Sequence, residues 1–381
     1  MPEKHAILSA SASARWLACP PSARLEAQLP EQTSSYAEEG TRAHAVAEKR
    51  LKHYLKTGQM YKNRLKDVDA EMWEATGRYV DICIEKISEA RTVSPDAEVH
   101  VEHQLDFGTW VPGGFGTGDM VIVSDKYIEV VDLKYGKGVP VSAAGNTQMR
   151  LYALGAYSEF GYLYGAEQVR MTIVQPRLDA VSTDELSAKE LLAWGHEVVG
   201  PTARLAWDGK GEKAAGDHCR FCRARATCRT RADYELKGVQ EDIAASDLTE
   251  PEIADIILRS GSIRAWLSDV ESYALGQALD GKAWPGLKLV AGRSIRKIQD
   301  AAAAAKALEA AGYAADDIYK APELKTITAL EKLVGKKKLP QVLGNIITKP
   351  PGKPTLVSES DKRQALALDD IKADFDDELI Q

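Results

Sequence analysis

The sequence has no long apolar run and no excess of positive charge. No stretch approaches the roughly 20 apolar residues that a membrane-spanning helix needs, and the first 22 residues lack the basic start and apolar core of a secretory signal. These absences predict a cytoplasmic protein with no membrane partner. The formal net charge of −7 excludes a protein that is basic throughout, but it allows a small basic groove on an acidic body.

Cysteine is scarce, and its five copies are an odd number in a chain where disulfides are not expected. Cys83 lies on an apolar helical face and is predicted to be a small buried hydrophobe. The other four form one early residue and a late C-x2-C-x5-C group: Cys19, Cys219, Cys222 and Cys228. Four thiolates hold either a [4Fe–4S] cluster or a tetrahedral Zn²⁺, and the spacing alone leaves both open.

The 381 residues suffice for two domains, and the 44% hydrophobic content is that of an ordinary globular protein. Alternating apolar patterns and turn residues predict a series of elements in the first 235 residues. We expect helices at 41–55 and 71–90, strands at 97–107, 119–125 and 127–135, a helix at 146–161, a strand at 168–178 and a helix at 187–207. A glycine-rich turn is expected at 111–119. This order predicts an α/β domain whose sheet is flanked by helices.

The remainder of the chain has a different texture. We expect an accessory, mainly helical α+β domain at 240–348, with helices at 248–279, 300–312 and 324–347 and a strand pair at 283–298. Residues 349–381 are expected to form a linker and an acidic tail.

The sequence Asp132-Leu-Lys134 lies on a predicted strand, so that its two charged side chains point to one face. A carboxylate beside an ammonium suits a place where a divalent cation meets a phosphate. In isolation such a pair is usually a structural salt bridge. Asp119 begins the preceding strand and is expected beside Asp132, where two carboxylates repel unless a cation lies between them.

Two helices add side chains at helical spacing. His44 and Glu48 are four residues apart, as are Gln148 and Tyr152, so each pair shares a helix face. The carboxylates suit Mg²⁺ or Mn²⁺, and an imidazole from His44 favours Mn²⁺. Each helical pair taken alone also fits a structural packing face.

The order of these motifs, G-x3-H-x3-E, G-x-G-D, D-x-K and Q-x3-Y, resembles the RecB-like PD-(D/E)XK nucleases over residues 9 to 232. The resemblance implies a restriction-endonuclease-like core in which His44, Asp119, Asp132 and the carbonyl of Leu133 bind the metal. It further implies that Lys134 is catalytic, with Gln148 and Tyr152 completing the site and Glu48 as a helix-face partner of it. D-x-K stands here in place of the more frequent E-x-K.

The cysteine arrangement is similar to that of CRISPR-associated iron–sulfur nucleases and AddB-type nucleases, which implies a [4Fe–4S] cluster closing the domain. The whole chain also resembles an uncharacterised phage-associated conserved family. Together these resemblances imply a DNA exonuclease that leaves 5′-phosphates at single- or double-stranded ends and acts with a phage single-strand annealing protein. The alternatives are an inert iron–sulfur DNA-binding module and a zinc-stapled scaffold. Five arginines near the cysteines are candidates for phosphate contacts or for a solvated turn: Arg220, Arg223, Arg225, Arg229 and Arg231.

Overall fold

The computed structural model describes residues 6–30, 35–240 and 249–288, and beyond them only residues 290, 306, 308, 310, 335 and 338–343. The chain divides into two units, one made of Met1–Ser246 with Ser262–Tyr273 and the other of Asp247–Gly261 with Ala274–Gln381. Of the predicted strand pair at 283–298, residues 283–288 and 290 are described and form no strand, and the others lie outside the described residues. Most of the helical segments after it and the acidic tail also lie outside the described residues. None of the helices in the described ranges has the length and apolar character needed to cross a membrane.

The first unit contains a five-stranded mixed sheet whose spatial order follows the chain: β1 (Glu98–Asp106), β2 (Phe115–Val123), β3 (Tyr127–Leu133), β4 (Gln168–Gln175) and β5 (Ala180–Ser187). Strands β3 and β4 are parallel, and every other neighbouring pair is antiparallel. The parallel pair requires a crossover, which runs through α5 (Thr147–Ala156).

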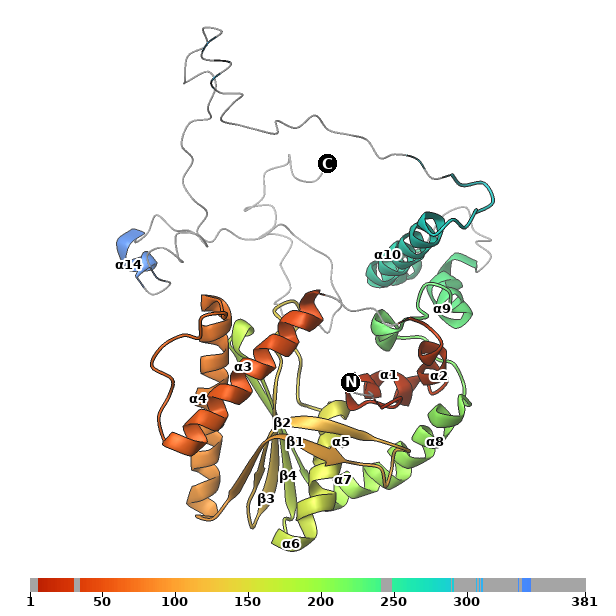
Figure 1. Ribbon diagram of the computed structural model, residues 1–381. Helices are drawn as coiled ribbons and strands as arrows, with labels where there is room; N and C mark the ends of the chain where they lie inside the picture. Colours follow the sequence, from red (N-terminus) through yellow and green to blue (C-terminus); the bar gives the residue numbers. More distant parts are fainter. Residues whose placement is uncertain are drawn as a thin grey trace. The chain divides into compact units, whose positions relative to one another are not determined.

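Helices cover both faces of the sheet (Figure 1). One face carries α3 (Ser35–Thr57) and α4 (Ala70–Val93), and the other carries α5, α7 (Ala188–Trp194) and α8 (Gly200–Asp208). Short helices α1 (Ser13–Ala18) and α2 (Ser22–Ala27) pack on α8. The remaining described helices are α6 (Tyr162–Tyr164), α9 (Arg229–Gln240), α10 (Glu250–Leu279), which runs through both units, and α14 (Leu339–Leu343).

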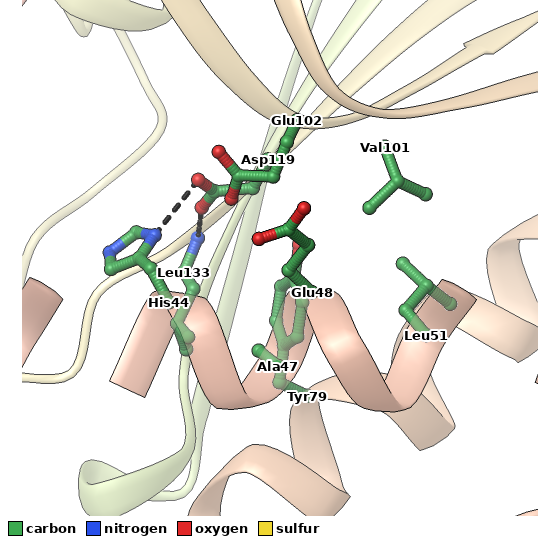
Figure 2. Close-up of a pocket in the computed structure, with 9 residues that line it drawn as sticks. All are labelled: His44, Ala47, Glu48, Leu51, Tyr79, Val101, Glu102, Asp119 and Leu133. Atoms are coloured by element: carbon green, nitrogen blue, oxygen red, sulfur yellow. Dashed lines mark hydrogen bonds and ion pairs between the residues drawn. The ribbon is translucent and has the colours of Figure 1, made fainter. Parts of the chain in front are cut away.

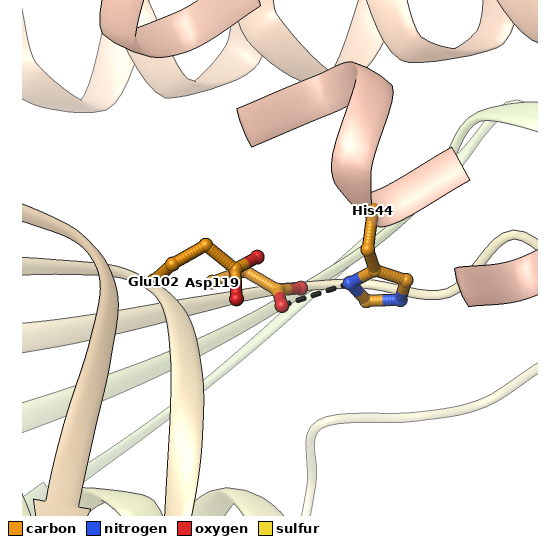
Figure 3. Close-up of side chains that lie close together, drawn as sticks. All are labelled: His44, Glu102 and Asp119. Carbon is orange, nitrogen blue, oxygen red and sulfur yellow. Dashed lines mark hydrogen bonds and ion pairs between the residues drawn. The ribbon is translucent and has the colours of Figure 1, made fainter. Parts of the chain in front are cut away.

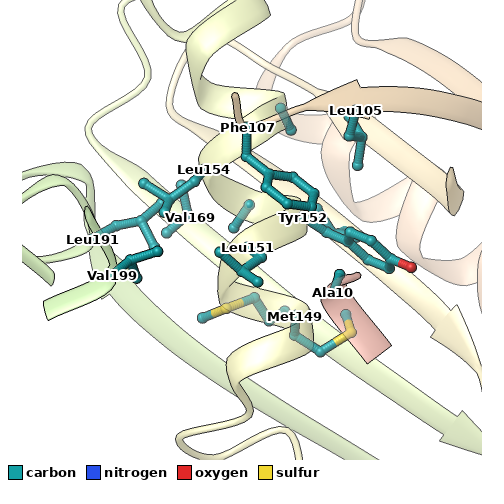
Figure 4. Close-up of a cluster of buried hydrophobic side chains, with 14 of the residues drawn as sticks. Ala10, Leu105, Phe107, Met149, Leu151, Tyr152, Leu154, Val169, Leu191 and Val199 are labelled. Atoms are coloured by element: carbon teal, nitrogen blue, oxygen red, sulfur yellow. The ribbon is translucent and has the colours of Figure 1, made fainter. Parts of the chain in front are cut away.

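Alternation along the strands produces two cores. In β2, Val121 and Val123 belong to the cluster beneath α5, whereas Met120 and Ile122 belong to the cluster beneath α3 and α4. Figure 4 shows the first cluster, in which Leu105, Tyr152 and Leu154 pack together. Every residue of β3 is buried, as expected for a strand covered on both faces.

The predicted α/β class with a helix-flanked sheet is confirmed, but two details were wrong. The sheet has a fifth strand, β5, which the sequence did not reveal because most of its residues are polar and its exposed residues alternate with half-buried ones at the sheet edge. The predicted glycine-rich turn ends early, since residues from Phe115 onward already form β2. Cys83 is fully buried in the α4 face, as predicted.

Candidate functional site

A distortion shared by β1 and β2 creates the site. The register runs from Val101 opposite Met120 to His103 opposite Gly118, and skips the pair between them, Glu102 and Asp119. Glu102 has a φ of 53°, a left-handed conformation that is strained for a residue with a side chain. Strain of this kind, held in place by the surrounding sheet, is typical of functional sites.

The distortion also changes which sheet face the side chains occupy. Along β1, Val101 packs beneath α3 and α4, but Leu105, an even number of residues later, packs beneath α5. His100 and His103, an odd number apart, both lie against Phe160, with ring centroids 4.8 Å and 5.6 Å away. A regular strand would place Val101 and Leu105 on the same face and His100 and His103 on opposite faces. The break at Glu102 therefore aims its carboxylate at the helix α3 side of the sheet end.

His44, Glu102 and Asp119 form a compact group in which one ligand atom from each lies within 4.8 Å of the others (Figure 3). His44 Nδ1 is 2.9 Å from Asp119 Oδ1, and the Leu133 amide donates to Asp119 Oδ2 at 2.6 Å. Glu48 lines the same pocket from α3, as does Leu133 from the end of β3 (Figure 2). Two strands and one helix thus direct an imidazole and carboxylates at one point.

A second group adjoins the first on the α5 side. Lys134 Nζ lies 2.9 Å from Asp132 Oδ2 and donates to Gln148 Oε1 at 3.0 Å. The Gln148 amide in turn lies 3.4 Å from Asp132 Oδ1 and 3.3 Å from the Tyr152 hydroxyl. The Asn146 side chain caps the start of α5 by accepting from the Met149 amide at 3.2 Å, which fixes the helical turn that carries Gln148.

The charges of each group shift the pKa values of the other. Burial raises the pKa of Asp132, and repulsion by Asp119 adds to this in spite of the Lys134 ammonium. Burial alone would lower the pKa of Lys134, but the Asp132 carboxylate more than compensates and the net pKa is raised. Burial would likewise lower the pKa of His44, but the hydrogen bond and negative charge of Asp119 outweigh this effect, so the net pKa is raised. Lys134 therefore keeps its positive charge at neutral pH.

Glu102 is the site residue that sequence reasoning missed. Burial, followed by repulsion from Asp119 and Glu48, raises its pKa to about 7. In the sequence Glu102 occupies a polar position of an alternating strand pattern, like Glu98 and Gln104. Such a position is a weak signal, because glutamates on the solvated face of a strand are common. The left-handed backbone that turns Glu102 into the site has no local signature.

Replacing Glu102 with glutamine is expected to stabilise the metal-free protein and weaken its binding of Mn²⁺. A carboxyl whose folded pKa is raised lowers the free energy of unfolding as pH rises from its ordinary pKa to about 7. Glutamine does not ionise, so the variant should unfold at higher urea than the wild type at pH 8. Even outer-shell partners of a metal contribute about 10–100-fold to affinity, so a lost ligand should weaken Mn²⁺ binding at least about tenfold.

The matched control is Glu197→Gln, which removes an exposed carboxylate on the helical segment before α8. It should leave both the urea midpoint and the calorimetric Mn²⁺ affinity unchanged. If Glu102→Gln behaved like this control, Glu102 would not belong to the metal site.

Gly116 lets the Tyr152 ring close over β2. A Cβ at this position would lie 2.5 Å from Tyr152 Cε1, too close for the rigid ring to remain in place. Gly116→Ala is therefore expected to lower the free energy of unfolding by about 1–3 kcal/mol, the usual effect of overpacking, and to displace the hydroxyl that holds Gln148. Urea denaturation measures the loss. Gly138→Ala is the control, since a Cβ added at Gly138 would have nothing within 4 Å. Equal urea midpoints for the two variants would contradict this account.

The four cysteines outside α4 lie together although 200 residues separate the first from the rest. Cys19, Cys219, Cys222 and Cys228 line one pocket beside α1 and α2. Burial raises the pKa of Cys222 to about 11 and also raises the pKa of Cys219, with repulsion from neighbouring thiolates contributing to both. Thiols with such raised pKa values lose their protons most readily when a metal takes the proton's place.

Glu26 ties the early segment to the late cysteine segment. Its carboxylate accepts from Arg15 Nε at 2.7 Å and from the Arg223 amide at 2.7 Å, and it is 5% exposed. Arg15 also donates to the Phe221 carbonyl at 3.1 Å. The cysteine pocket is therefore held by polar contacts that do not involve the thiols themselves.

The arginines of this segment have mainly structural partners. Arg225 and Arg231 bind the Asp269 carboxylate of α10 at 2.8 Å and 2.7 Å, and Arg231 is 5% exposed. Arg223 donates to the Leu29 carbonyl at 3.1 Å. At least these three arginines therefore have partners within the protein, which agrees poorly with a simple solvated turn. Arg229 is exposed, and Arg220 lies over the Phe221 ring.

Comparison with known proteins identifies one family. A family model described as "Protein of unknown function (DUF2800)" matches residues 5–364. Among solved structures, one entitled "Crystal structure of SSO0001" is 14% identical, and the match covers 49% of this chain and 82% of that chain with a TM-score of 0.21. A score this low carries no conclusion about fold or function.

Proposed function

The chain belongs to the family described as "Protein of unknown function (DUF2800)", and from its site we propose that it is a divalent-metal-dependent deoxyribonuclease with a PD-(D/E)XK core. One observation carries the proposal: the Asp132–Lys134 pair, 2.9 Å apart, adjoins a group of ligands drawn from α3, β1 and β2. A structural salt bridge needs neither the strained Glu102 nor the neighbouring imidazole. A cation and a phosphodiester would use both.

The ligand group fits a divalent cation. Carboxylate oxygens of Glu102 and Asp119 are hard donors, and the His44 nitrogen adds a preference for Mn²⁺ over Ca²⁺. The mutual repulsion that raises the pKa of Glu102 is relieved when a cation lies between the carboxylates. A bound cation would lower the pKa of a water molecule and stabilise negative charge on the phosphoryl oxygens. We propose Asp132 and the Leu133 carbonyl as further ligands.

The residues of the α5 side position and stabilise the reacting phosphate. Asp132 and Gln148 hold Lys134, so that its charged ammonium is already oriented before a phosphate binds. It stabilises charge developing on a phosphoryl oxygen, because its raised pKa makes it a poor base. Tyr152 holds the Gln148 amide in turn. Water oxygen bonds to phosphorus, the bond to the 3′ oxygen breaks, and that oxygen takes a proton, leaving a 5′-phosphate.

We propose that the cysteine pocket holds a [4Fe–4S] cluster rather than one zinc ion. All four thiols line one pocket, so a single inorganic core can take every one of them as a ligand. Four thiolates also suit a tetrahedral Zn²⁺. The similarity of the cysteine arrangement to that of iron–sulfur nucleases favours the cluster.

The test is cleavage of linear and circular DNA, single- and double-stranded, with Mn²⁺, Mg²⁺ or EDTA. We expect metal-dependent loss of linear DNA from its ends, sparing of circles, and products that a 5′-phosphate-dependent ligase joins. Binding without any cleavage by metal-loaded protein would instead indicate an inert DNA-binding module and would overturn the nuclease proposal.

A further inference from the structure

A strongly basic surface lies beside the site on the same helix. Residues 42–66 contain eight lysines and arginines and a single carboxylate, Glu48, in a chain whose formal net charge is −7. One of the eight, Arg50, is buried between α3 and α4. The other seven are exposed. The positive charge that a nucleic-acid-binding protein needs is therefore concentrated next to His44 and Glu48.

The exposed cations of α3 follow one helical stripe, which we call the α3 basic stripe: Arg42, Lys49, Lys52 and Lys56. Successive members are seven, three and four residues apart, the spacing of one face of a helix. At about 100° per residue, this face is centred roughly 120° around the helix from His44. Lys52 borders the site directly, with its ammonium 2.7 Å from the Glu48 carboxylate.

Most of these cations have no acidic partner among the described residues. Within the described part of the chain, Lys49 and Lys56 of the stripe have no carboxylate within 4.0 Å, and the same holds for Lys62, Arg64 and Lys66 in the loop that follows α3. Solvated side chains of one sign repel one another and lower the stability of the fold. Their arrangement is favourable when a polyanion lies along them.

We infer that the α3 basic stripe binds the phosphate backbone of the nucleic acid whose phosphodiester reaches the His44–Glu102–Asp119 group. The stripe is about 21 Å long at 1.5 Å per residue, which matches about six phosphates at 3.4 Å of rise per strand. This inference rests on the proposed function for the identity of the polyanion. It assigns to α3 two roles on neighbouring faces, a metal ligand on one and backbone contacts on the other.

The test uses the full chain in EDTA, so that binding is measured without cleavage. Fluorescence anisotropy with a labelled duplex, and with the single strand of the same sequence, gives the dissociation constant between about 50 and 200 mM KCl. The variant is Lys49→Gln with Lys56→Gln. The control is Lys126→Gln with Lys189→Gln, which removes the same charge from exposed lysines at the opposite end of β3.

Six to ten phosphate contacts change affinity by about 10³–10⁵ over this salt range, which is about threefold per contact. The stripe variant lacks two lysines, so we expect it to bind about tenfold more weakly than the control. Its log–log salt slope should be shallower by about 1.8 on duplex and about 1.4 on single strands, at 0.9 and 0.7 per contact. The substrate on which the slope changes identifies the form of DNA that the stripe contacts. Thermal midpoints should not fall below the wild-type value, because both lysines are exposed and their removal relieves repulsion between like charges.

Equal affinities and slopes for the two double variants would overturn the inference, as would a wild-type protein that does not bind DNA. Tighter binding to phosphatidylglycerol vesicles than to DNA, lost in the stripe variant, would overturn the nucleic-acid assignment. The nuclease proposal fails separately: a protein that binds DNA through the stripe but cleaves nothing with Mn²⁺ would leave this inference standing. A protein that cleaves DNA, but whose DNA affinity is the same in the stripe variant and the control, would support the nuclease proposal and overturn this inference.

Discussion

Lys134→Ala is expected to reduce metal-dependent DNA cleavage by about 10²–10³-fold, the usual effect of removing one preorganised charge-stabilising donor. The side chain is fixed between Asp132 Oδ2 and Gln148 Oε1, at 2.9 Å and 3.0 Å. Its raised pKa keeps it charged through neutral pH. The loss should therefore appear in the rate of the chemical step rather than in the affinity for DNA.

Single-turnover cleavage with saturating enzyme measures that rate, and anisotropy in EDTA measures the affinity. Lys126→Ala is the matched control, because this exposed lysine lies at the other end of β3. Asp132→Asn tests the partner with a side chain of the same shape and should also lose at least about 10²-fold. Unchanged cleavage by Lys134→Ala in clean protein would mean that the activity belongs to another site or another protein.

Cys222→Ala is expected to give a colourless protein that unfolds about 10 °C below the wild type. A cofactor whose concentration is about 1,000 times its dissociation constant stabilises the folded state by about 4 kcal/mol. Each kcal/mol shifts the thermal midpoint by about 2–4 °C for a unit of this size. All four thiols line one pocket, so one substitution is enough to disturb the ligand set. Cys19 and the late cysteine segment meet at this pocket, so assembly of the proposed cluster would be part of the folding free energy.

Anaerobic purification followed by iron and acid-labile sulfide analysis and a thermal melt measures both effects. Cys83→Ala is the control, because this thiol lies on the buried face of α4 and does not line the pocket. It should keep the colour and the iron, although it loses some packing. Zinc in place of iron and sulfide in the wild type would refute the cluster and support the zinc scaffold.

The two experiments address independent parts of the molecule. The site at the end of β3 is built by β1, β2, α3 and α5, whereas the cysteine pocket is built by α1, α2 and the segment before α9. Loss of colour with cleavage retained would make the cluster a structural device. Loss of both in Cys222→Ala, with binding of DNA also lost, would indicate that the domain has unfolded.

The sequence by itself determined the features that depend on local periodicity. Alternation placed Asp132 and Lys134 on one face of β3, and four-residue spacing placed Gln148 and Tyr152 on one face of α5. The order of helices and strands predicted an α/β unit, and the cysteine spacing singled out four thiols that the fold brings to one pocket. These patterns are visible because each is repeated within a few residues of the chain.

Only the tertiary structure decided which distant groups meet and which charges are already used. Glu102 enters the site because a left-handed residue in β1 breaks the alternation opposite Asp119. Arg225 and Arg231 are taken by Asp269, more than 35 residues away in the sequence. Strand β5 forms because β4 offers it an edge. The physical reason is the same in each case: backbone strain and long-range ion pairs are stabilised by neighbours that local sequence does not specify.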